Sequence, residues 1–249
     1  MRRLLIFLVL CANAFAADRR IAVIAHRGEH LRHPENTLEA FQGAVDAGAD
    51  FFELDVRTSA DGRLVLMHDS TVDRMTDGSG QIGQMTFEAI RKLSVHGSRV
   101  PTLEEALQFA RGKIGVYVDC KYIAPANLVN ALEEANMSDR VVIYRGAEFL
   151  KQVAALRPEL KIMPEAGSIE RLQSLLAAIP LKVVAFDARD FLDPVIAVAR
   201  KARADVYVDR LGPADTEASW QDAIDRGATG IQTDHPVELA VYLKSKGYR

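Results

Sequence analysis

Short apolar runs alternate with longer amphipathic stretches along most of the chain. From residue 21 onward, eight runs have the length and composition typical of buried parallel strands. They are Ile21–Ala25, Phe51–Val56, Ile114–Val118, Val141–Tyr144, Lys161–Met163, Val183–Phe186, Asp205–Val208 and Gly230–Thr233. Helical periodicity occurs between most of them, at Leu38–Ala47, Leu103–Ala110, Ala126–Ala135, Glu148–Leu156, Ile169–Ala178, Pro194–Ala202 and Ala218–Asp225. This alternation predicts an α/β fold with a parallel sheet.

Eight strand–helix units in one domain favour a closed (β/α)8 barrel of the TIM type over an open sheet. Thr102 has Glu105 three residues later, which is the spacing of a helix capping box. Asn36 stands at the same spacing before another helix, and we expect Asn36 and Thr37 to cap it. The polar segment Ser70–Val100 interrupts the alternation, and we expect it to pass over the barrel mouth.

The stretch Phe51–Asp69 predicts a β-hairpin extension at the second strand. Its two arms meet at Asp61-Gly62, a dipeptide that favours a two-residue type I′ turn. With such a turn Asp55 lies opposite His68, on one face of the ribbon. Glu53 is two residues before Asp55 and therefore points to the same face. The hairpin is expected to bring two carboxylates and an imidazole together.

The first residues have the three parts of a secretory signal. Arg2 and Arg3 precede a short apolar run, and Ala14–Ala16 has the form of a cleavage site. The run is too short to span a bilayer comfortably. We expect residues 1–16 to be a signal peptide and 17–249 to be an exported domain, periplasmic or secreted, without a stable membrane anchor after cleavage. An uncleaved anchor is the alternative.

Composition fits one soluble globular domain, because 49% of the 249 residues are hydrophobic and can bury one large core. The net charge of −3 gives no electrostatic case for binding nucleic acid. Cys120 is the only cysteine in the expected mature chain, which excludes an internal disulfide. The sequence does not determine the oligomeric state.

Catalytic residues of such barrels lie at the C-terminal ends of the strands. His26 and Arg27 follow the first predicted strand, and Asp119 and Lys121 follow the third. Polar residues also end the remaining strands: Tyr144-Arg145, Glu165, Asp187, Asp209-Arg210 and Asp234. We expect these side chains to surround one mouth.

Four of these segments together resemble a known family. They are AHRGEHLRHPENTLEAF at Ala25–Phe41, ELDVRTSADGRLVLMHD at Glu53–Asp69, VPTLEEAL at Val100–Leu107 and GATGIQTDHP at Gly227–Pro236. The chain resembles the glycerophosphodiester phosphodiesterases. The resemblance implies a TIM-type barrel, a divalent metal and a small-molecule substrate, a glycerophosphodiester cleaved to glycerol 3-phosphate and an alcohol.

The resemblance also suggests the roles of single residues. Glu53, Asp55 and Asp119 offer hard oxygen ligands to one divalent cation, Mg²⁺ or Ca²⁺. The family's third ligand is usually Glu, so Asp119 has a shorter reach. A structural pairing of Asp119 with Lys121 is the alternative to a metal-binding role.

Arg27 and Lys121 can complement the phosphate, Arg through its planar fork and Lys as a point charge. His26 and His68 are expected to share general base and acid duties. In the family scheme one histidine deprotonates the glycerol 2-hydroxyl and the other protonates the leaving alcohol. The sequence does not assign the two roles.

The second half departs from the family's pattern, with Tyr144-Arg145 in place of a Ser-Phe pair and Tyr207–Arg210 in place of Trp-Thr-x-Asn. We expect Glu165 and Asp209 to contact substrate at an acidic rim around the leaving alcohol, to which Asp187 also contributes, with Arg145 and Arg210 adding opposite charge. Such a rim favours a sugar, a polyol or an amino alcohol as leaving group. A phospholipase D-like barrel acting on lysolipid or sphingolipid, and a silent barrel that binds phosphate or sugar, remain alternatives.

Overall fold

A computed structural model describes residues 20–249, so the expected signal peptide lies outside the described residues. The strands are β1 (Ala22–Ala25), β2 (Phe51–Thr58), β3 (Leu64–Leu66), β4 (Ser94–Val95), β5 (Ser98–Arg99), β6 (Gly115–Tyr122), β7 (Val141–Tyr144), β8 (Lys161–Met163), β9 (Val183–Phe186), β10 (Asp205–Arg210) and β11 (Gly230–Thr233). The helices are α1 (Leu38–Asp46), α2 (Phe87–Arg91), α3 (Leu103–Ala110), α4 (Pro125–Glu134), α5 (Ala147–Leu156), α6 (Ile169–Ala178), α7 (Asp193–Lys201), α8 (Glu217–Arg226) and α9 (Pro236–Ser245), with short 3₁₀ turns at Ile82–Gln84 and Gly212–Ala214. Within these residues, none of the helices combines the length and apolar character that a bilayer crossing requires.

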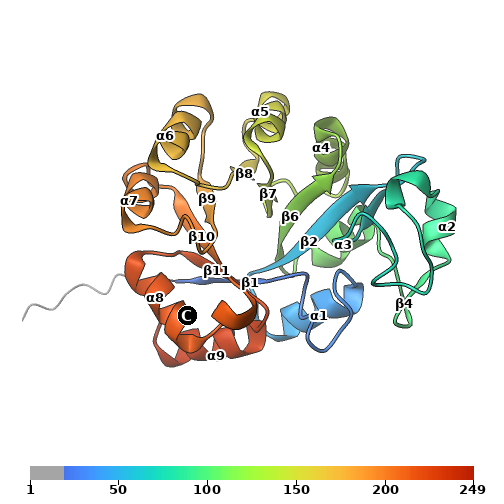
Figure 1. Cartoon of the computed structure of the whole chain (residues 1–249), viewed down its shortest axis with the longest axis horizontal. Coiled ribbons are helices and arrows are strands. Elements are labelled where there is room, and N and C mark those ends of the chain that lie inside the picture. The colour runs from blue at the N-terminus through green and yellow to red at the C-terminus, as the bar shows by residue number, and fades with distance from the viewer. Residues whose placement is uncertain (1–19) are drawn as a thin grey trace, which may run out of the picture.

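Eight parallel strands form a barrel in the order β8-β7-β6-β2-β1-β11-β10-β9 (Figure 1). The ring closes just beyond β8, where Glu165 forms a parallel bridge with Ala185 of β9. Two backbone hydrogen bonds make this seam, from Ala166 N to Ala185 O at 2.8 Å and from Ala185 N to Pro164 O at 3.0 Å. The predicted TIM-type fold is confirmed, and all eight barrel strands lie in the predicted places.

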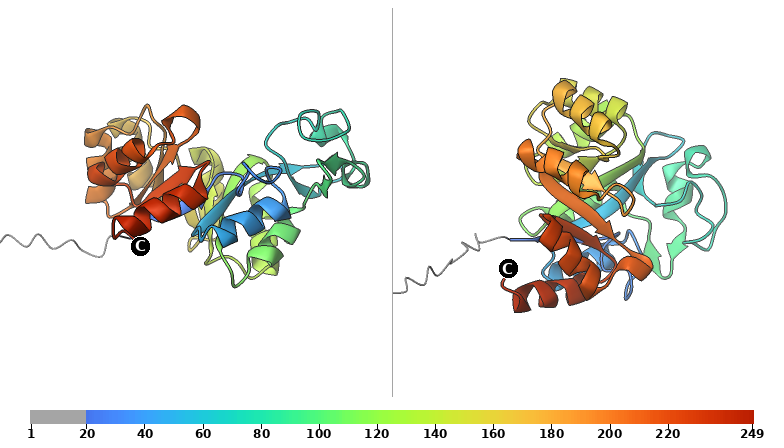
Figure 2. Two further views of the ribbon diagram at one scale, coloured as in Figure 1. Left: turned by 90° about the horizontal axis from the view of Figure 1, so that it is seen from below. Right: turned by 60° about the vertical axis from the view of Figure 1, so that its left-hand side comes forward.

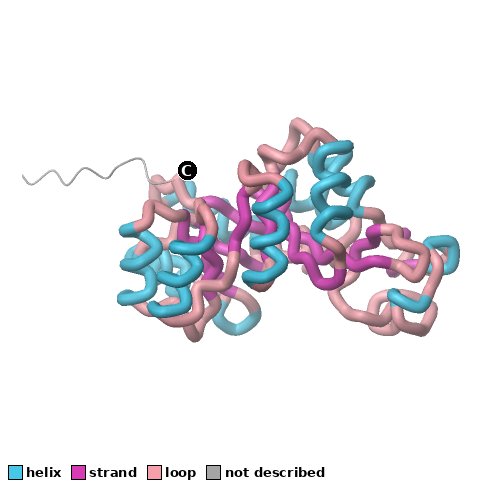
Figure 3. Tube along the Cα trace, turned by 90° about the horizontal axis from the view of Figure 1, so that it is seen from above, coloured by secondary structure: helices cyan, strands magenta, loops and turns pink. Residues whose placement is uncertain are grey.

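Helices surround the strands on the outside (Figure 3). One apolar cluster fills the barrel and includes Ile24, Tyr117 and Met163. Two larger clusters lie between the strands and the helices; the Phe41 and Phe52 rings stack at 4.0 Å in one of them. Cys120 is buried in that outer cluster, as strand alternation predicts, and burial raises the pKa of its thiol.

The β2–β3 hairpin forms, but its predicted register is wrong by one residue. Val56 pairs with Leu66, and Ser59 N donates to Arg63 O at 2.9 Å. The loop therefore has three residues, 60–62, and Gly62 adopts a positive φ of 84°. Since a one-residue slip moves side chains to the other face, Met67 lies opposite Asp55 where we expected His68.

Side-chain contacts explain the longer turn. The Ser59 hydroxyl donates to Asp61 at 2.6 Å and accepts from Arg63 N at 2.9 Å. Asp61 also accepts the backbone N–H of Phe87, which opens α2. These bonds hold the loop against the following segment, and a two-residue Asp-Gly turn would lose them.

The segment 70–100 forms a small lobe beside the barrel, beyond the ends of β2 and β6, and does not pass over the mouth as expected (Figures 1 and 2). It contains α2 and the β4–β5 hairpin. A separate buried cluster supports it, with Val72, Ile82 and Ile90 packed on Val65 and Met67. The hairpin register turns Met67 toward this lobe, and that burial stabilises the observed register.

Both predicted helix caps can be checked. The capping box of Thr102 and Glu105 at α3 is confirmed in both of its hydrogen bonds. At α1 the N-cap is Thr37, whose hydroxyl accepts from Ala40 N at 3.3 Å. Asn36 does not cap the helix, and its side chain points toward β2 instead. The last helix, α9, was not predicted.

Candidate active site

Three carboxylates meet at the C-terminal ends of β2 and β6. Glu53, Asp55 and Asp119 each offer an oxygen, and these oxygens lie within 4.8 Å of one another. Glu53 and Asp55 share a strand face, and the parallel register sets Asp119 directly beside Asp55. Both β2 residues are almost inaccessible to solvent, at 2% and 1% exposure. The three predicted metal ligands are therefore together.

The electrostatics of this cluster favour a cation. Burial raises the pKa of Glu53 well above its usual value, and the charges of Asp55 and Asp119 raise it further. Burial also raises the pKa of Asp119, although Lys121 opposes that change. The three carboxylates repel one another, and a bound cation would offset this repulsion. An all-oxygen donor set of this kind fits a hard divalent cation such as Mg²⁺ or Ca²⁺. We describe it as a candidate metal centre.

Asn36 and Lys121 hold the carboxylates in place. Asn36 Nδ2 donates to Asp55 Oδ2 at 2.7 Å, and its Oδ1 accepts from Asp55 N at 3.0 Å. Lys121 Nζ lies 2.6 Å from Asp119 Oδ2 and 3.2 Å from Asp55 Oδ1. Burial disfavours the Lys121 ammonium, but the two aspartates outweigh it and raise its pKa. Asp119 is therefore paired with Lys121, and this pairing leaves it inside the cluster, where a metal-binding role stays a prediction.

Arg27 closes the cluster from the loop after β1. Its N–H donates to Glu53 Oε2 at 2.8 Å, and its Nη1 lies 3.2 Å from Glu35. Its Nε is buried, 3.6 Å from Asp55 Oδ2, and makes no hydrogen bond within residues 20–249. A donor in this position is available to an anionic ligand.

The backbone of this loop is folded tightly. Arg27 has a positive φ of 53°, and Gly28 after it has a φ of 83°. A Cβ at Gly28 would lie 2.7 Å from the Ala40 carbonyl carbon of α1. Only glycine fits this close approach, which aims the Arg27 side chain at the carboxylates.

His26 lies at the end of β1 and is held by Asp234 at the end of β11. His26 Nδ1 and Asp234 Oδ1 are 2.7 Å apart, and the other Asp234 oxygen accepts Gly212 N at 2.8 Å. Burial lowers the pKa of His26, although the Asp234 hydrogen bond opposes this effect. Burial works against the Asp234 carboxylate, but its bonds with His26 and Gly212 lower its pKa to about 2. The strand ends placed Asp234 at this mouth, but the sequence did not pair it with His26.

His68 lies beyond β3 and is not paired with Asp55. Its Nδ1 is hydrogen-bonded to Asp69 at 2.8 Å. From Asp69 a chain of contacts leads back to the cluster. Arg74 of the lobe binds Asp69 at 2.6 Å and Glu35 at 2.7 Å, and Glu35 contacts Arg27. The lobe thus connects the second histidine to the residues around the candidate metal centre.

The other half of the mouth is acidic. Burial raises the pKa of Asp209 to about 7, with Asp187 and Asp119 adding to the shift. Burial and Asp187 also raise the pKa of Glu165. Asp209 therefore lies close enough to interact electrostatically with Asp119 of the metal cluster and with Asp187 of the acidic half. The expected basic contribution of Arg210 is absent from this mouth, because its guanidinium stacks on Phe191 outside the barrel.

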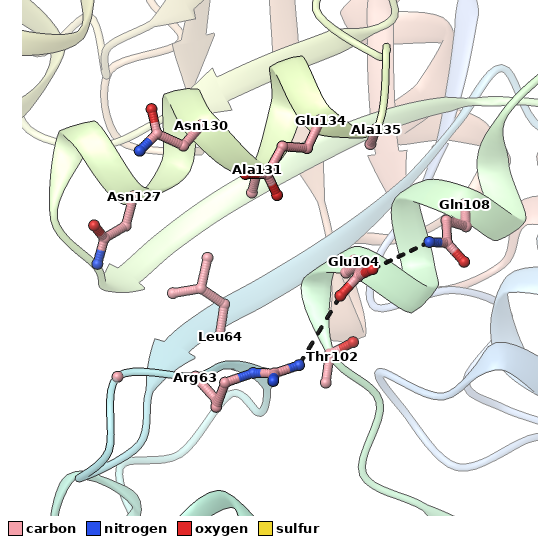
Figure 4. A pocket seen from close by; sticks show the side chains of 11 residues that line it. Arg63, Leu64, Thr102, Glu104, Gln108, Asn127, Asn130, Ala131, Glu134 and Ala135 are labelled. Atoms are coloured by element: carbon pink, nitrogen blue, oxygen red, sulfur yellow. Dashed lines mark hydrogen bonds and ion pairs between the residues drawn. The ribbon is translucent and has the colours of Figure 1, made fainter.

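A cavity of about 560 Å³ includes Glu165 and Asp187 of the acidic rim, whereas the predicted catalytic and metal-binding residues line none of the five main cavities of the described chain. A groove of about 450 Å³ lies on the flank of the barrel between the hairpin loop, α3 and α4 (Figure 4). In this groove Glu104 contacts both Arg63 and Gln108. None of the predicted catalytic, metal or phosphate residues lines this groove.

Comparisons with known proteins find relatives in sequence and in fold. The chain is 34% identical over 245 residues to a glycerophosphodiester phosphodiesterase of Caldanaerobacter subterraneus, a match that covers 90% of this chain and 98% of the relative. The crystal structure of a glycerophosphodiester phosphodiesterase from Agrobacterium tumefaciens superposes with a TM-score of 0.79 at 29% identity, over 89% of this chain and 99% of that one. An Oleispira antarctica phosphodiesterase, solved with its product sn-glycerol-3-phosphate, has a TM-score of 0.79 at 24% identity, over 88% of this chain and 96% of that one.

A model of the glycerophosphoryl diester phosphodiesterase family matches residues 26–238, nearly the whole described barrel. The match includes the loop after β1, the carboxylates of β2 and β6, and the end of β11. The chain belongs to the glycerophosphodiester phosphodiesterase family, whose members are phosphoric diester hydrolases.

Proposed function

We propose that this protein hydrolyses glycerophosphodiesters to glycerol 3-phosphate and an alcohol, with one divalent cation bound. The buried cluster of Glu53, Asp55 and Asp119, flanked by Arg27 and His26, carries the proposal. The Oleispira relative, solved with sn-glycerol-3-phosphate, supports the assignment of the product.

Glu53, Asp55 and Asp119 would hold the cation, Mg²⁺ or Ca²⁺. When bound, the ion supplies Lewis-acid stabilisation of a phosphate oxygen. Arg27 can donate to the phosphate through Nε, which has no other hydrogen-bond partner within the described chain. Lys121 keeps its charge beside Asp119 and complements the substrate anion.

Two histidines would move the protons. The Nδ1 atoms of His26 and His68 are each bound to an aspartate, Asp234 and Asp69 respectively. Nε2 is then the ring nitrogen left for substrate, and the carboxylates orient each ring. One histidine would take the proton of the glycerol 2-hydroxyl as that oxygen attacks phosphorus. The other would protonate the leaving alcohol, and water would then open the cyclic phosphate.

Glu165 and Asp209 are proposed to contact the alcohol side of the substrate, on the acidic half of the mouth.

We also propose, on the sequence features alone, that residues 1–16 direct export and are removed. N-terminal sequencing of the purified cellular protein tests this part, because a cleaved chain begins at Ala17 and an uncleaved one at Met1.

Phosphate-ester hydrolysis with and without EDTA, followed by Mg²⁺ or Ca²⁺ addition, tests the main proposal. We expect glycerol 3-phosphate release that EDTA abolishes and metal restores. His26→Ala and His68→Ala should each lower turnover about 10²-fold or more. His96→Asn is the matched control, because His96 is exposed on the lobe and its positive φ suits Asn.

Four outcomes would contradict the scheme. Full activity in EDTA would remove the metal from it. Near-wild-type turnover in both histidine variants would remove the proton transfers assigned to them. Hydrolysis of lysolipids alone would favour the phospholipase D-like alternative, and no hydrolysis of any ester would favour a binding protein.

A further inference from the structure

Two polar side chains lie next to each other inside the barrel, at the mouth ends of β10 and β11. On β10, Tyr207 packs into the interior cluster and Val208 into an outer one, so Asp209 faces the interior. On β11, Ile231 packs outward, so Gln232 also faces inward. The parallel register pairs Asp209 with Gln232 directly. Both therefore point into the same part of the mouth.

Neither group has a partner for its acceptor atoms within residues 20–249. Gln232 is 6% exposed, and its Oε1 is buried without a hydrogen bond. The Asp209 carboxylate likewise receives no hydrogen bond and forms no ion pair with the described residues. A buried acceptor without a donor is costly, so Gln232 Oε1 favours a ligand that carries donors, and the half-buried Asp209 carboxylate beside it can accept from the same ligand.

The neighbouring acidic residues differ in the hydrogen-bond and ion-pair partners that they already have. Asp187 accepts from Arg189 Nε at 2.8 Å, and Asp190 accepts the backbone N–H groups of Gly167 and Asp187. Glu165 forms no ion pair with another residue of the described chain. Asp209 and Glu165 therefore carry negative charge without an ion pair in the described chain, although Arg171 lies near enough to Glu165 to oppose the rise in its pKa.

We propose that Asp209, Gln232 and Glu165 bind the leaving alcohol through a primary ammonium group. This inference rests on the proposed function, and it makes glycerophosphoethanolamine the preferred substrate over glycerophosphocholine and glycerophosphoinositol. A primary ammonium carries three N–H donors and a positive charge, so it satisfies unpaired acceptors and offsets the acidic charge together.

The two competing leaving groups each lack one of these properties. A trimethylammonium has charge but no N–H donor, and proteins typically recognise it with an aromatic cage. Tyr144 beside this site is paired with Tyr117 at 5.9 Å between ring centroids, which makes no cage of this kind. Inositol has hydroxyl donors but no positive charge.

Steady-state kinetics of the metal-saturated enzyme with each of the three substrates test the inference. We expect kcat/KM for glycerophosphoethanolamine to exceed that for glycerophosphocholine about ten-fold or more. Asp209→Asn and Gln232→Leu should lower kcat/KM for glycerophosphoethanolamine more than kcat/KM for glycerophosphocholine, because only the primary ammonium donates N–H groups to these oxygens, so the ratio falls toward one. Asp205→Asn is the matched control, since Asp205 is exposed at the opposite end of β10.

Equal rates, or faster cleavage of glycerophosphocholine, would overturn the inference. A uniform loss on all substrates in Asp209→Asn would also overturn it, because the residue would then serve the glycerol half that they share. If no substrate is cleaved, the proposed function fails. Calorimetry with metal-loaded His68→Ala still decides the inference, since tighter binding of glycerophosphoethanolamine than of glycerophosphocholine supports it and equal binding refutes it.

Discussion

His26 and Asp234 are 208 positions apart in the chain, yet their side chains are hydrogen-bonded at 2.7 Å. The neighbouring residues keep Asp234 in place. Asp215 accepts the Asp234 N–H at 2.6 Å and the Thr233 hydroxyl at 2.8 Å, and Trp220 Nε1 donates to it at 2.6 Å. Asp234 therefore orients the imidazole of His26, the candidate base or acid, and Asp215 in turn fixes the backbone of Asp234.

Asp234→Asn should lower kcat about 10²-fold or more, because an amide no longer selects the imidazole orientation and tautomer that a carboxylate favours. KM should change little. Initial-rate kinetics measure both values, with Asp225→Asn as control, since Asp225 is exposed and hydrogen-bonded to Gln221, away from the mouth. A parallel loss of kcat in the control, or none in Asp234→Asn, would contradict the role.

The same substitution should change the dependence of stability on pH. The pKa of Asp234 is about 2 in the folded chain and about 4 in an unfolded one. A lowered carboxyl pKa stabilises the fold above pH 4, and this stabilisation is lost as pH falls toward 2. Denaturant unfolding should therefore show a difference between wild type and Asp234→Asn that shrinks between about pH 4 and pH 2. A constant difference would refute this.

The loop between β1 and α1 is the element that joins the helix to the metal cluster. Arg27 and Asn36, near its ends, both have positive φ values, 53° and 58°, and Asn36 N donates to Arg27 O at 3.1 Å. This closure turns the Asn36 amide onto Asp55, so the capping role passes to Thr37. Adjacent residues thereby serve different parts of the molecule.

Thr37→Ala and Asn36→Ala separate these two functions. Loss of the Thr37 cap should lower the free energy of unfolding by about 1 kcal/mol and leave metal affinity nearly unchanged. Loss of the Asn36 amide removes the support of a metal ligand and should weaken metal binding about 10- to 100-fold. Denaturant titration and calorimetry with Mg²⁺ or Ca²⁺ measure the two effects. Equal metal affinities in the two variants would show that Asn36 does not support the site.

The whole barrel is held unequally around its circumference. β2 and β6 are each eight residues long and are paired from Phe51 to Arg57. β8 and β9 are three and four residues long, and the seam between them consists of one bridge with two backbone hydrogen bonds around Ala185. Regions with few backbone hydrogen bonds open most readily in native proteins.

Hydrogen exchange should therefore find the weakest strand protection at the β8–β9 seam. The amides of Ala166 and Ala185 should exchange faster than those of Leu54 and Val118 in β2 and β6, which lie in the middle of the longest pairing. Mass spectrometry with fragment resolution, or NMR, measures the difference under native conditions. Protection at the seam equal to that in β2 would contradict this view of the barrel.

Local patterns were sufficient for much of the fold. The bounds of β7 and β9 agree with apolar runs, because a strand buried on both faces is apolar throughout. The bounds of β8 and β11 were also predicted, although each strand contains polar residues. The α3 capping box was also readable, since both of its bonds form within four residues. The hairpin register was not, because Met67 packs against a lobe whose position the ribbon's own sequence does not encode.

Strand alternation and strand ends likewise determined, from sequence alone, that Glu53, Asp55 and Asp119 would share one edge of a barrel. Only the tertiary structure decided which atoms hold them and what lies opposite. The contact of Asn36 with Asp55 depends on the fold of the loop after β1, and that of Asp234 with His26 on the pairing of β1 with β11. The adjacency of Asp209 and Gln232 depends on the register of β10 with β11. Periodicity reports which face of its own element a residue occupies, whereas the partner across a closed barrel is set by the packing of all eight strands together.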